Sequence, residues 1–377
     1  MARPVPKDIV VMDAPIDLGS SPVGPAARPD GSPWGVLRKR LFGTWWESLI
    51  TLASAALILW GLAWVLRWAL FDAAWATTAA ACGDAAGACW SVIASRWRLI
   101  LFGLYPHQEH WRSALSCAIV VATVVVSCIR WFWRPWLLGS IWAASTVSFF
   151  VLMKGGVLGL AEVPTDKWGG LVLTLFVFVC TLLIGMPVGI VLALMRQSKL
   201  PAVRLVTVFV VDVVRSIPLL SVVFGIAFFA PFFLPQFLTG DKIYRVVVGY
   251  AFFFGCLQAM VVAGGLQSIA AGQAEAATAL GLRKWQVIAL VILPQALKAS
   301  LPATINLVVM AFKDTSVLVI VGLLELTASG NIAYQSGDWS SYYAEVFVFI
   351  ALIYFSFSYS LSRYGAFLER RMRLGAD

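Results

Sequence analysis

The sequence predicts an all-α polytopic membrane protein with about eight transmembrane helices, and two observations carry that prediction. Of its 377 residues, 60% are hydrophobic and only 12% are charged. A soluble protein has no core large enough to bury that much apolar surface. The chain also contains stretches that reach the roughly 20 apolar residues a helix needs to cross a bilayer. Their approximate bounds are 47–70, 112–130, 135–153, 169–195, 207–234, 245–268, 301–324 and 344–363.

The first 46 residues are expected to form a disordered tail. Residues 1–34 are rich in Pro, Gly, Asp and Ser, a composition that does not bury enough apolar surface to fold. No short apolar core followed by a small-residue cleavage site lies near Met1. We therefore expect no removable signal peptide.

A long connection, 71–111, separates the first two spans, and we expect it to be an exposed loop. Its Ala-rich part, 73–95, holds two glycines and an aspartate in the middle, and these residues disfavour a helix. Cys82 and Cys89 share this loop and would form a disulfide if it faces an oxidising compartment. The other four cysteines lie in apolar runs, where they act as small hydrophobic residues.

The distribution of Lys and Arg predicts the orientation, because cytoplasmic connections of membrane proteins carry an excess of both. The connection 325–343 has neither. The basic residues of the opposite side are Arg38, Lys39, Arg40, Arg130, Arg134, Arg196, Lys199, Arg204, Arg283, Lys284, Arg363, Arg370, Arg371 and Arg373. Both termini are therefore predicted to be cytoplasmic and 71–111 to be periplasmic. The net charge of +9 then needs no nucleic-acid partner.

The stretch 275–295, "EAATALGLRKWQVIALVILPQ", interrupts the apolar runs on the predicted cytoplasmic side. Ala276, Ala277 and Leu280 share one face of a short helix by i, i+3, i+4 spacing. Gly281 ends that helix by adopting a left-handed conformation, and a second short helix follows. Small residues allow a partner surface to approach closely, as in a helix that docks into a groove. The alternative is an amphipathic helix that rests on lipid headgroups.

These residues resemble the EAA loop of the permeases of binding-protein-dependent ABC transporters. The resemblance rests on Glu275–Ala277, on Gly281 and on Val291–Pro294 after a nine-residue gap. In that family the loop forms coupling helices that insert into a cleft of the ATP-binding subunit. The resemblance therefore implies that the residues coupling to an ATPase subunit are Glu275, Ala276, Ala277, Leu280, Gly281 and Trp285.

Other segments resemble the polar amino-acid branch of these permeases. They are 169–204, "RSIPLL" at 215–220, 264–282, "LPQALKASLP" at 293–302 and "KDTS" at 313–316. The similarity covers about 169–370, which implies the five-helix permease core of an ABC importer, with the cytoplasmic coupling loop at 275–295. The preceding part, 47–168, adds three transmembrane helices and the long 71–111 loop. It resembles the extended M subunit of the general L-amino-acid permease system.

The resemblance implies the membrane permease subunit of an ATP-driven amino-acid importer in the bacterial inner membrane. The chain contains no GxxxxGKS/T loop, whose backbone cradles nucleotide phosphates. We therefore expect it to bind no cofactor and to be no enzyme, with ATP and Mg²⁺ on a separate ATPase subunit. The expected partners are two ATP-binding subunits, a periplasmic amino-acid-binding protein, a second permease subunit, the amino-acid substrate and the lipid bilayer.

One departure from the family pattern bears on the second permease subunit. Alignment of Gly264 and Gly265 with the family's usual AEVxRGG places Met260 at the glutamate and Ala263 at the arginine. Both charges are lost together, as expected if they normally satisfy each other. We therefore expect a heteromeric permease pair, in which the other subunit retains these charges.

Two charged residues, Lys313 and Asp314, lie near the middle of the seventh predicted span. A charge at that depth costs roughly 2.5–3.5 kcal/mol on insertion scales, so it should face a partner or a water-filled path. One interpretation is a structural pair within the bundle. The other is a site in the substrate pathway, because an amino-acid zwitterion needs both an anionic and a cationic partner; Thr315, Ser316 and Asn306 are polar neighbours.

Asp212 and Arg215 form a second candidate pair for the pathway. Pro218 frees a backbone carbonyl in the turn before it, and broken helices often line transport sites. If the span begins only at Ile217, however, both charged residues stay at the cytoplasmic interface.

The remaining patterns predict no site. His107 and His110 have only Glu109 nearby, so we predict no metal site. The rival function from another class is a secondary amino-acid transporter driven by an ion gradient, with Lys313 and Asp314 as the relay. An ABC exporter half is disfavoured, because exporters usually fuse the ATPase domain and lack the EAA loop.

Overall fold

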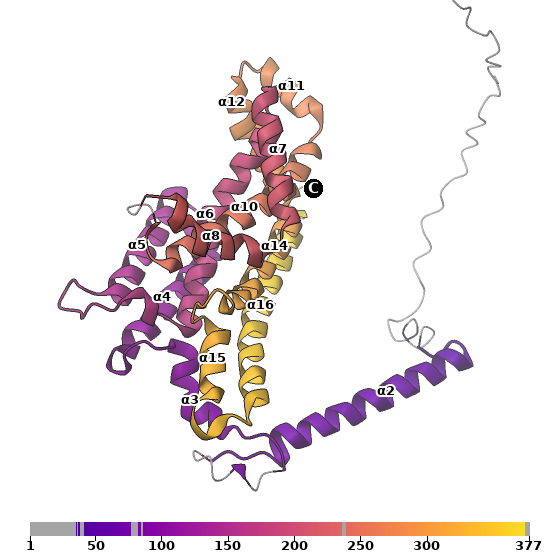
Figure 1. Ribbon diagram of the computed structural model, residues 1–377. Helices are drawn as coiled ribbons and strands as arrows, with labels where there is room; N and C mark the ends of the chain where they lie inside the picture. Colours follow the sequence, from indigo (N-terminus) through magenta and orange to yellow (C-terminus); the bar gives the residue numbers. More distant parts are fainter. Residues whose placement is uncertain are drawn as a thin grey trace, which may run out of the picture. The chain divides into compact units, whose positions relative to one another are not determined.

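The protein is described by a computed structural model (Figure 1) covering residues 35, 37, 41–76, 82–83, 86–235 and 239–373. Most of the predicted tail, 1–46, lies outside these residues. Within the described ranges every regular element apart from two isolated β-bridges is a helix, which confirms the all-α prediction. The chain divides into two units, residues 1–67 and 68–377, and each is described by itself.

The first unit contributes α2 (Trp45–Leu66), an apolar helix with no buried side chain. It begins at a capping box, in which the Thr44 hydroxyl accepts from the Glu47 amide and the Glu47 carboxylate accepts from the Thr44 amide. This exchange satisfies two donors that a helix N-terminus otherwise leaves unpaired. A helix that is apolar on all sides suits a lipid environment.

The second unit holds the other membrane-length helices. They are α4 (His110–Ser127), α5 (Pro135–Lys154), α6 (Gly170–Arg196), α10 (Lys242–Gln267), α14 (Leu301–Asp314) and α16 (Tyr343–Arg373). Short helical turns over His107–Glu109, Arg130–Phe132, Thr165–Lys167, Thr315–Val319 and Gly337–Trp339 connect or extend them. Among the described residues, seven helices could each cross a membrane, or up to eight if a bent pair counts as one span.

The centre of this unit is the contact between α6 and α10, which glycines make possible. A Cβ atom added to Gly189 would lie 2.7 Å from the Cβ of Gln258, and one added to Gly255 would lie 2.8 Å from Val188. Any larger side chain at these positions would push the two helices apart. Small residues at helix crossings are the usual means of close packing in membranes.

The predicted span 207–234 is not one helix. It is a pair, α7 (Pro201–Ser216) and α8 (Leu219–Phe233), whose axes meet at 104°. The bend follows from Pro218, which has no amide hydrogen to donate and which forces the residue before it into extended conformation. Ile217 accordingly has φ −96° and ψ 139°.

The connection 71–111 is not an exposed loop throughout, because α3 (Ser91–Phe102) lies within it. The glycines do interrupt helix up to Gly87, but the residues after Trp90 bury Val92 and Ile100 against α15 (Leu326–Gln335). This packing stabilises α3, because a helix of 12 residues is only marginally stable on its own. We refer to α3, α15 and residues 343–354 of α16 as the α3–α15 cap.

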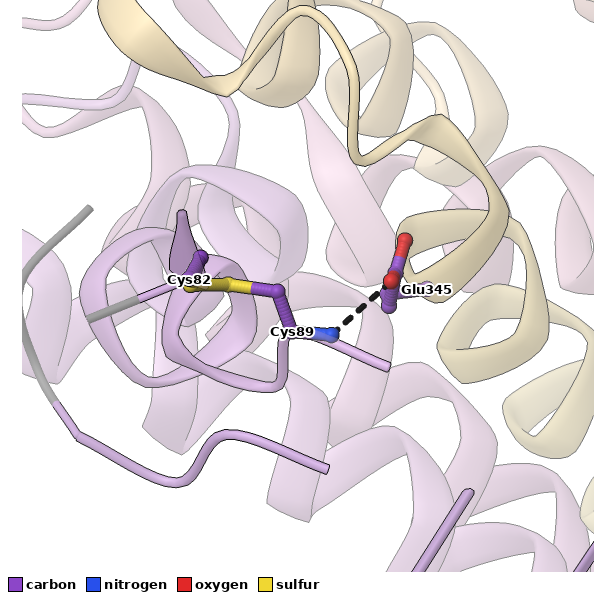
Figure 2. The surroundings of a disulfide bond; sticks show 3 residues. All are labelled: Cys82, Cys89 and Glu345. Atoms are coloured by element: carbon purple, nitrogen blue, oxygen red, sulfur yellow. Dashed lines mark hydrogen bonds between the residues drawn. A yellow bond between two sulfur atoms is a disulfide. The ribbon is translucent and has the colours of Figure 1, made fainter. Parts of the chain in front are cut away.

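A disulfide joins Cys82 to Cys89 and holds the segment before α3 against this cap. Figure 2 shows the Cys89 amide donating to the Glu345 carboxylate of α16 over 2.9 Å. Both sulfur-bearing residues are buried with Leu326, Val346 and Ile350. The pairing that the sequence made conditional on an oxidising compartment is therefore present.

We expect loss of the disulfide to loosen the α3–α15 cap without unfolding the spans. Replacing Cys82 and Cys89 by Ser should cost about 2 kcal/mol, because the cross-link restricts the open state of a short loop. Limited proteolysis within 71–91 should then be roughly 30-fold faster. Cys117→Ser, at an unpaired thiol, is the control. Equal proteolysis rates in wild type and the double variant would contradict a clamping role.

Candidate functional site

The stretch singled out by sequence folds as a compact hairpin over residues 271–299. Its first arm is α11 (Ala271–Ala279), and its second arm comprises α12 (Lys284–Gln286), a π-helical turn over Val287–Ile292 and α13 (Leu293–Ala299). Figure 1 shows α11 and α12 at the end of the second unit opposite to α3 and α15. We call this element the 271–299 hairpin.

Gly281 makes the turn between the two arms. Its φ is +81°, in the left-handed region that glycine adopts without steric cost. The Gly281 amide donates to Thr278 O over 2.9 Å and the Leu282 amide donates to Ala277 O over 3.3 Å. These two hydrogen bonds form a Schellman motif, so the predicted glycine break is present.

The arms of the 271–299 hairpin pack on each other. Ala277 and Val287 are 4% and 6% exposed, and the Gln295 amide donates to the Gln273 side-chain oxygen over 3.2 Å. The expectation that Ala277 faces a partner therefore needs correction. Its small side chain allows the second arm of its own hairpin to approach, and this requirement is invisible to helical spacing alone.

Other predicted residues of the hairpin do point outward. Glu275 and Ala276 are exposed, Leu280 is 84% exposed and Trp285 is 62% exposed. Leu290, which sequence reasoning left out, is 63% exposed. The hairpin thus presents large apolar side chains beside Arg283 and Lys284. Such an exposed apolar patch rimmed by polar residues is typical of a protein or membrane interaction site.

The hairpin is fixed to the membrane helices through α13. Ala296 is fully buried against Gly265 of α10, where any side chain at Gly265 would strike the Ala296 carbonyl. The neighbouring Ser300 Cβ would lie 3.0 Å from such a side chain. A force applied to the hairpin therefore passes directly to α10 and, through Ser300, to the start of α14.

The polar residues predicted in the seventh span divide between two faces of α14. Asn306, Met310 and Lys313 are exposed and share one face by i, i+4, i+7 spacing. Asp314 is half-buried beside Tyr250 and Leu307, and the described residues contain no ion pair between it and Lys313. Thr315 is buried, and its hydroxyl donates to Phe312 O over 2.7 Å. The two charged groups therefore do not pair with each other, and the structural and the pathway interpretations both stay predictions.

Comparison with known proteins identifies the family. Residues 185–374 match the family described as binding-protein-dependent transport system inner membrane component. The inner membrane amino-acid ABC transporter permease protein YhdY of Escherichia coli K12 is 37% identical over 362 residues, covering 95% of this chain and 98% of that protein. The chain belongs to this family. The resemblance drawn from residues 275–295 is confirmed, against the ion-driven alternative.

A second relative and a solved structure are also similar to this chain. The glutamate/glutamine/aspartate/asparagine transport system permease protein BztC of Rhodobacter capsulatus is 32% identical and covers 74% of this chain and 77% of its own length. A crystal structure of an amino acid ABC transporter with histidines is 29% identical, covers 54% of this chain and 92% of its own, and superposes with a TM-score of 0.45. The family match and the similarity to YhdY make the permease a multi-pass inner-membrane transport subunit, and in such systems ATP hydrolysis resides in a separate subunit.

Asp212 and Arg215 of the permease lie at the contact between α6 and α7. The Asp212 carboxylate accepts from Arg196 over 3.3 Å and lies 3.4 Å from the Arg215 Nε. Arg196 is the last residue of α6. This triad ties α7 to the end of α6, which favours the interfacial alternative for these two residues.

Sequence reasoning missed a buried carboxylate at Glu325. Its side chain caps α15 by accepting from the Thr327 amide over 2.8 Å and the Ala328 amide over 2.9 Å. The Tyr354 hydroxyl donates to it over 3.0 Å. Burial raises the pKa of Glu325 to about 7, although these hydrogen bonds act to lower it. A lone acidic residue in the apolar run "VGLLELT" was the available signal.

Glu325 makes the stability of the α3–α15 cap depend on pH. Its native pKa of about 7 exceeds the ordinary value of 4.5, so the folded chain holds more protons than the unfolded chain between those values. Stability should therefore be greatest below pH 4.5 and fall as the pH rises to 7, by roughly 3 kcal/mol. Thermal unfolding in detergent at pH 5 and pH 7.5 measures this fall.

Glu325→Gln should flatten that dependence, because the amide does not titrate. Asp338→Asn removes an exposed acid from the adjoining turn and should leave the dependence unchanged. A wild-type pH profile that coincides with that of Glu325→Gln would contradict the assignment.

Proposed function

We propose that this chain is the membrane permease subunit of an ATP-driven importer of amino acids, and that the 271–299 hairpin couples it to the ATPase subunit. The observation that carries the proposal is the rigid hairpin with Leu280 and Trp285 at its exposed turn. Both relatives, YhdY and BztC, are amino-acid permeases by name, which supports the substrate class.

A protein cleft suits the hairpin better than lipid headgroups. Burying a Leu or aromatic side chain fully is worth roughly 1.5–3 kcal/mol each, so Leu280, Trp285 and Leu290 together favour a complementary groove. The Schellman turn and the contact between the arms hold these side chains in place before docking, which reduces the ordering cost of association. Arg283 and Lys284 would then contact the rim of the groove.

The orientation we propose is both termini in the cytoplasm. The disulfide-bearing segment and the 271–299 hairpin lie at opposite ends of the second unit (Figure 1). Disulfides persist in the periplasm and not in the bacterial cytoplasm, so the cap end is periplasmic and the hairpin end cytoplasmic. A single crossing by α2 before the cap then leaves the N-terminal segment in the cytoplasm.

We also propose a heteromeric permease pair with two ATP-binding subunits and a periplasmic amino-acid-binding protein. Ala263, at the position where the family pattern has an arginine, is 3% exposed in an apolar cluster with Val262 and Leu266. A charge missing from this subunit would be supplied by its counterpart. ATP and Mg²⁺ belong to the ATP-binding subunits, and this chain would bind no cofactor.

In the substrate pathway we assign Lys313 and Asn306 to direct contact, because the exposed face of α14 carries both. Asp314 and Thr315 would act behind that face. Asp212 and Arg215 would instead hold α7 to the end of α6 at the cytoplasmic interface. We propose residues 169–370 as the permease domain, and 47–168 as an extension with three membrane helices.

Leu280→Arg tests the coupling role. It should weaken docking of the ATPase subunit by tenfold or more, while the membrane level of the permease stays normal. Binding-protein-stimulated ATP hydrolysis and uptake by proteoliposomes should both be lost. Leu280→Met, which keeps volume and apolarity, is the matched control.

The rivals give different results in the same assay. A hairpin resting on anionic headgroups would tolerate Leu280→Arg, because an added cation favours the membrane surface. A gradient-driven carrier would lose wild-type uptake on addition of an ionophore and keep it without ATP. Either result would overturn the proposed function.

Lys313→Met tests the pathway assignment. If Lys313 contacts substrate, assembly and basal ATP hydrolysis should persist while uptake falls by roughly tenfold or more, the effect of losing one charge-assisted hydrogen bond. Met310→Leu, on the same face of α14, is the control. Failure of Lys313→Met to insert or assemble would instead indicate a structural role.

A further inference from the structure

A charged cavity lies at the proposed periplasmic end of the membrane helices, and none of the α14 residues lines it. It has a volume of about 770 Å³. Its walls come from the end of α5, the segment 162–168, the start of α10 and the turn 322–324. These segments are far apart in the sequence, so nothing local predicts that they meet.

The start of α10 presents one anion and one cation to this cavity, and both are held in place. The Thr165 hydroxyl donates to the Asp241 carboxylate over 2.7 Å. The Lys242 ammonium donates to Gly322 O over 2.9 Å. An ammonium has three donors and a carboxylate has two acceptor oxygens, so each group keeps capacity for a ligand.

The opposite wall adds charges of both signs. Lys154, Glu162 and Asp166 line the cavity and are exposed. The Val163 amide donates to Lys154 O over 2.7 Å, which fixes this segment against the end of α5. The apolar part of the lining is buried: Trp168 is 1% exposed, Ile243 3% and Leu323 6%.

Charged residues also gather at the ends of membrane helices simply to reach water. That explanation accounts for Lys154 or Asp166 alone. It does not account for Asp241 and Lys242, because a hydrogen bond to a distant segment directs each charged group. The partner of Asp241, Thr165, is 76 residues away, and the partner of Lys242, Gly322, is 80 residues away. A concave site with paired opposite charges complements a zwitterion.

We propose that this cavity is a periplasmic amino-acid binding site, in which Lys242 and Lys154 bind the α-carboxylate and Asp241 binds the α-ammonium group. The proposal rests on amino-acid import as the function. Residues 154–168 lie outside the matched family region 185–374, whereas Asp241, Lys242 and Gly322 lie inside it. The extension would thus complete a site that the matched region leaves half-built, holding substrate before it enters the pathway.

The test uses the assembled transporter in nanodiscs, without ATP or binding protein. L-glutamate, L-glutamine, L-arginine and L-leucine are titrated by calorimetry, followed by their N-acetylated forms. Lys242→Gln, Lys154→Gln and Asp241→Asn should each weaken binding of the amino acid by about tenfold, the effect of losing one charge-assisted contact. Among the described residues the Lys154 ammonium makes no hydrogen bond or ion pair, so Lys154→Gln covers the case in which Lys242→Gln misfolds.

Lys167→Gln is the matched control, because it removes the same charge from the same segment at a residue that does not line the cavity. It should bind like wild type. N-acetylation removes the ammonium charge, so N-acetylated ligands should bind weakly and be indifferent to Asp241→Asn. For Lys154→Gln the uptake KM in proteoliposomes should rise in parallel with the dissociation constant from calorimetry, with the maximal rate unchanged.

Two results would overturn the proposed site, and a third would overturn the proposed function alone. Variants that bind and transport like Lys167→Gln while wild type imports amino acids would remove the site and leave the proposed function standing. Unchanged amino-acid binding with weaker docking of the binding protein in co-sedimentation would make the cavity a protein contact. Absence of ATP-driven uptake in wild type would contradict the proposed function itself, and the calorimetry would still decide the site.

Discussion

The rest of the permease depends on the glycine-lined contact between α6 and α10. Gly185, Gly189 and Gly255 bring the two backbones close enough that no side chain fits between them. In a bilayer the hydrophobic effect does not drive helices together, because lipid tails are as apolar as the helix surfaces. The close van der Waals contact between α6 and α10 therefore has to supply the association. The contact positions both ends of α10 at once, with Asp241 at one end and Gly265 at the other.

Several buried polar side chains of this framework donate to backbone carbonyls of neighbouring elements, and Arg112 also pairs with the Glu109 carboxylate at 3.6 Å. Arg112 of α4 is fully buried, and its guanidinium donates to Leu152 O over 2.6 Å and to Ala161 O over 2.9 Å. Tyr250 donates to Ala311 O over 2.6 Å. The Arg112 bonds connect segments within the extension, and the Tyr250 bond connects α10 to α14 within the core. These polar contacts fix neighbouring segments where apolar contact alone would allow sliding.

The sequence predicted those features that depend on local chemistry. Span lengths follow from hydropathy, and the turn at Gly281 follows from the conformational freedom of glycine. Pro218 likewise indicates a break in the helix, although hydropathy predicts one continuous span over 207–234. These properties need only a few neighbouring residues, so one sequence suffices to find them.

Features that depend on distant partners were missed or inverted. Ala277 looked available for an external surface because helical spacing does not reveal that the π-helical turn over Val287–Ile292 packs against α11. The helix α3 gains its stability from α15, more than 200 residues later, so its own composition suggested a loop. Glu325 shows no periodicity at all, and only the fold reveals that Tyr354 and the α15 amides surround it.

The proposed periplasmic site and the coupling hairpin are joined by one helix. α10 runs through 26 residues from Lys242 to Gln267, about 39 Å. A rigid helix can transmit a displacement, but it does not by itself make the ligand bind one access state more tightly than the other. Amino-acid binding at Asp241 and Lys242 therefore influences the hairpin only if the cavity differs between the two access states.

The hydrogen bond from Lys242 to Gly322 gives a physical route to such a difference. Gly322 follows the α14 segment, so movement of α14 against α10 would separate the ammonium from its carbonyl and change the affinity of the cavity.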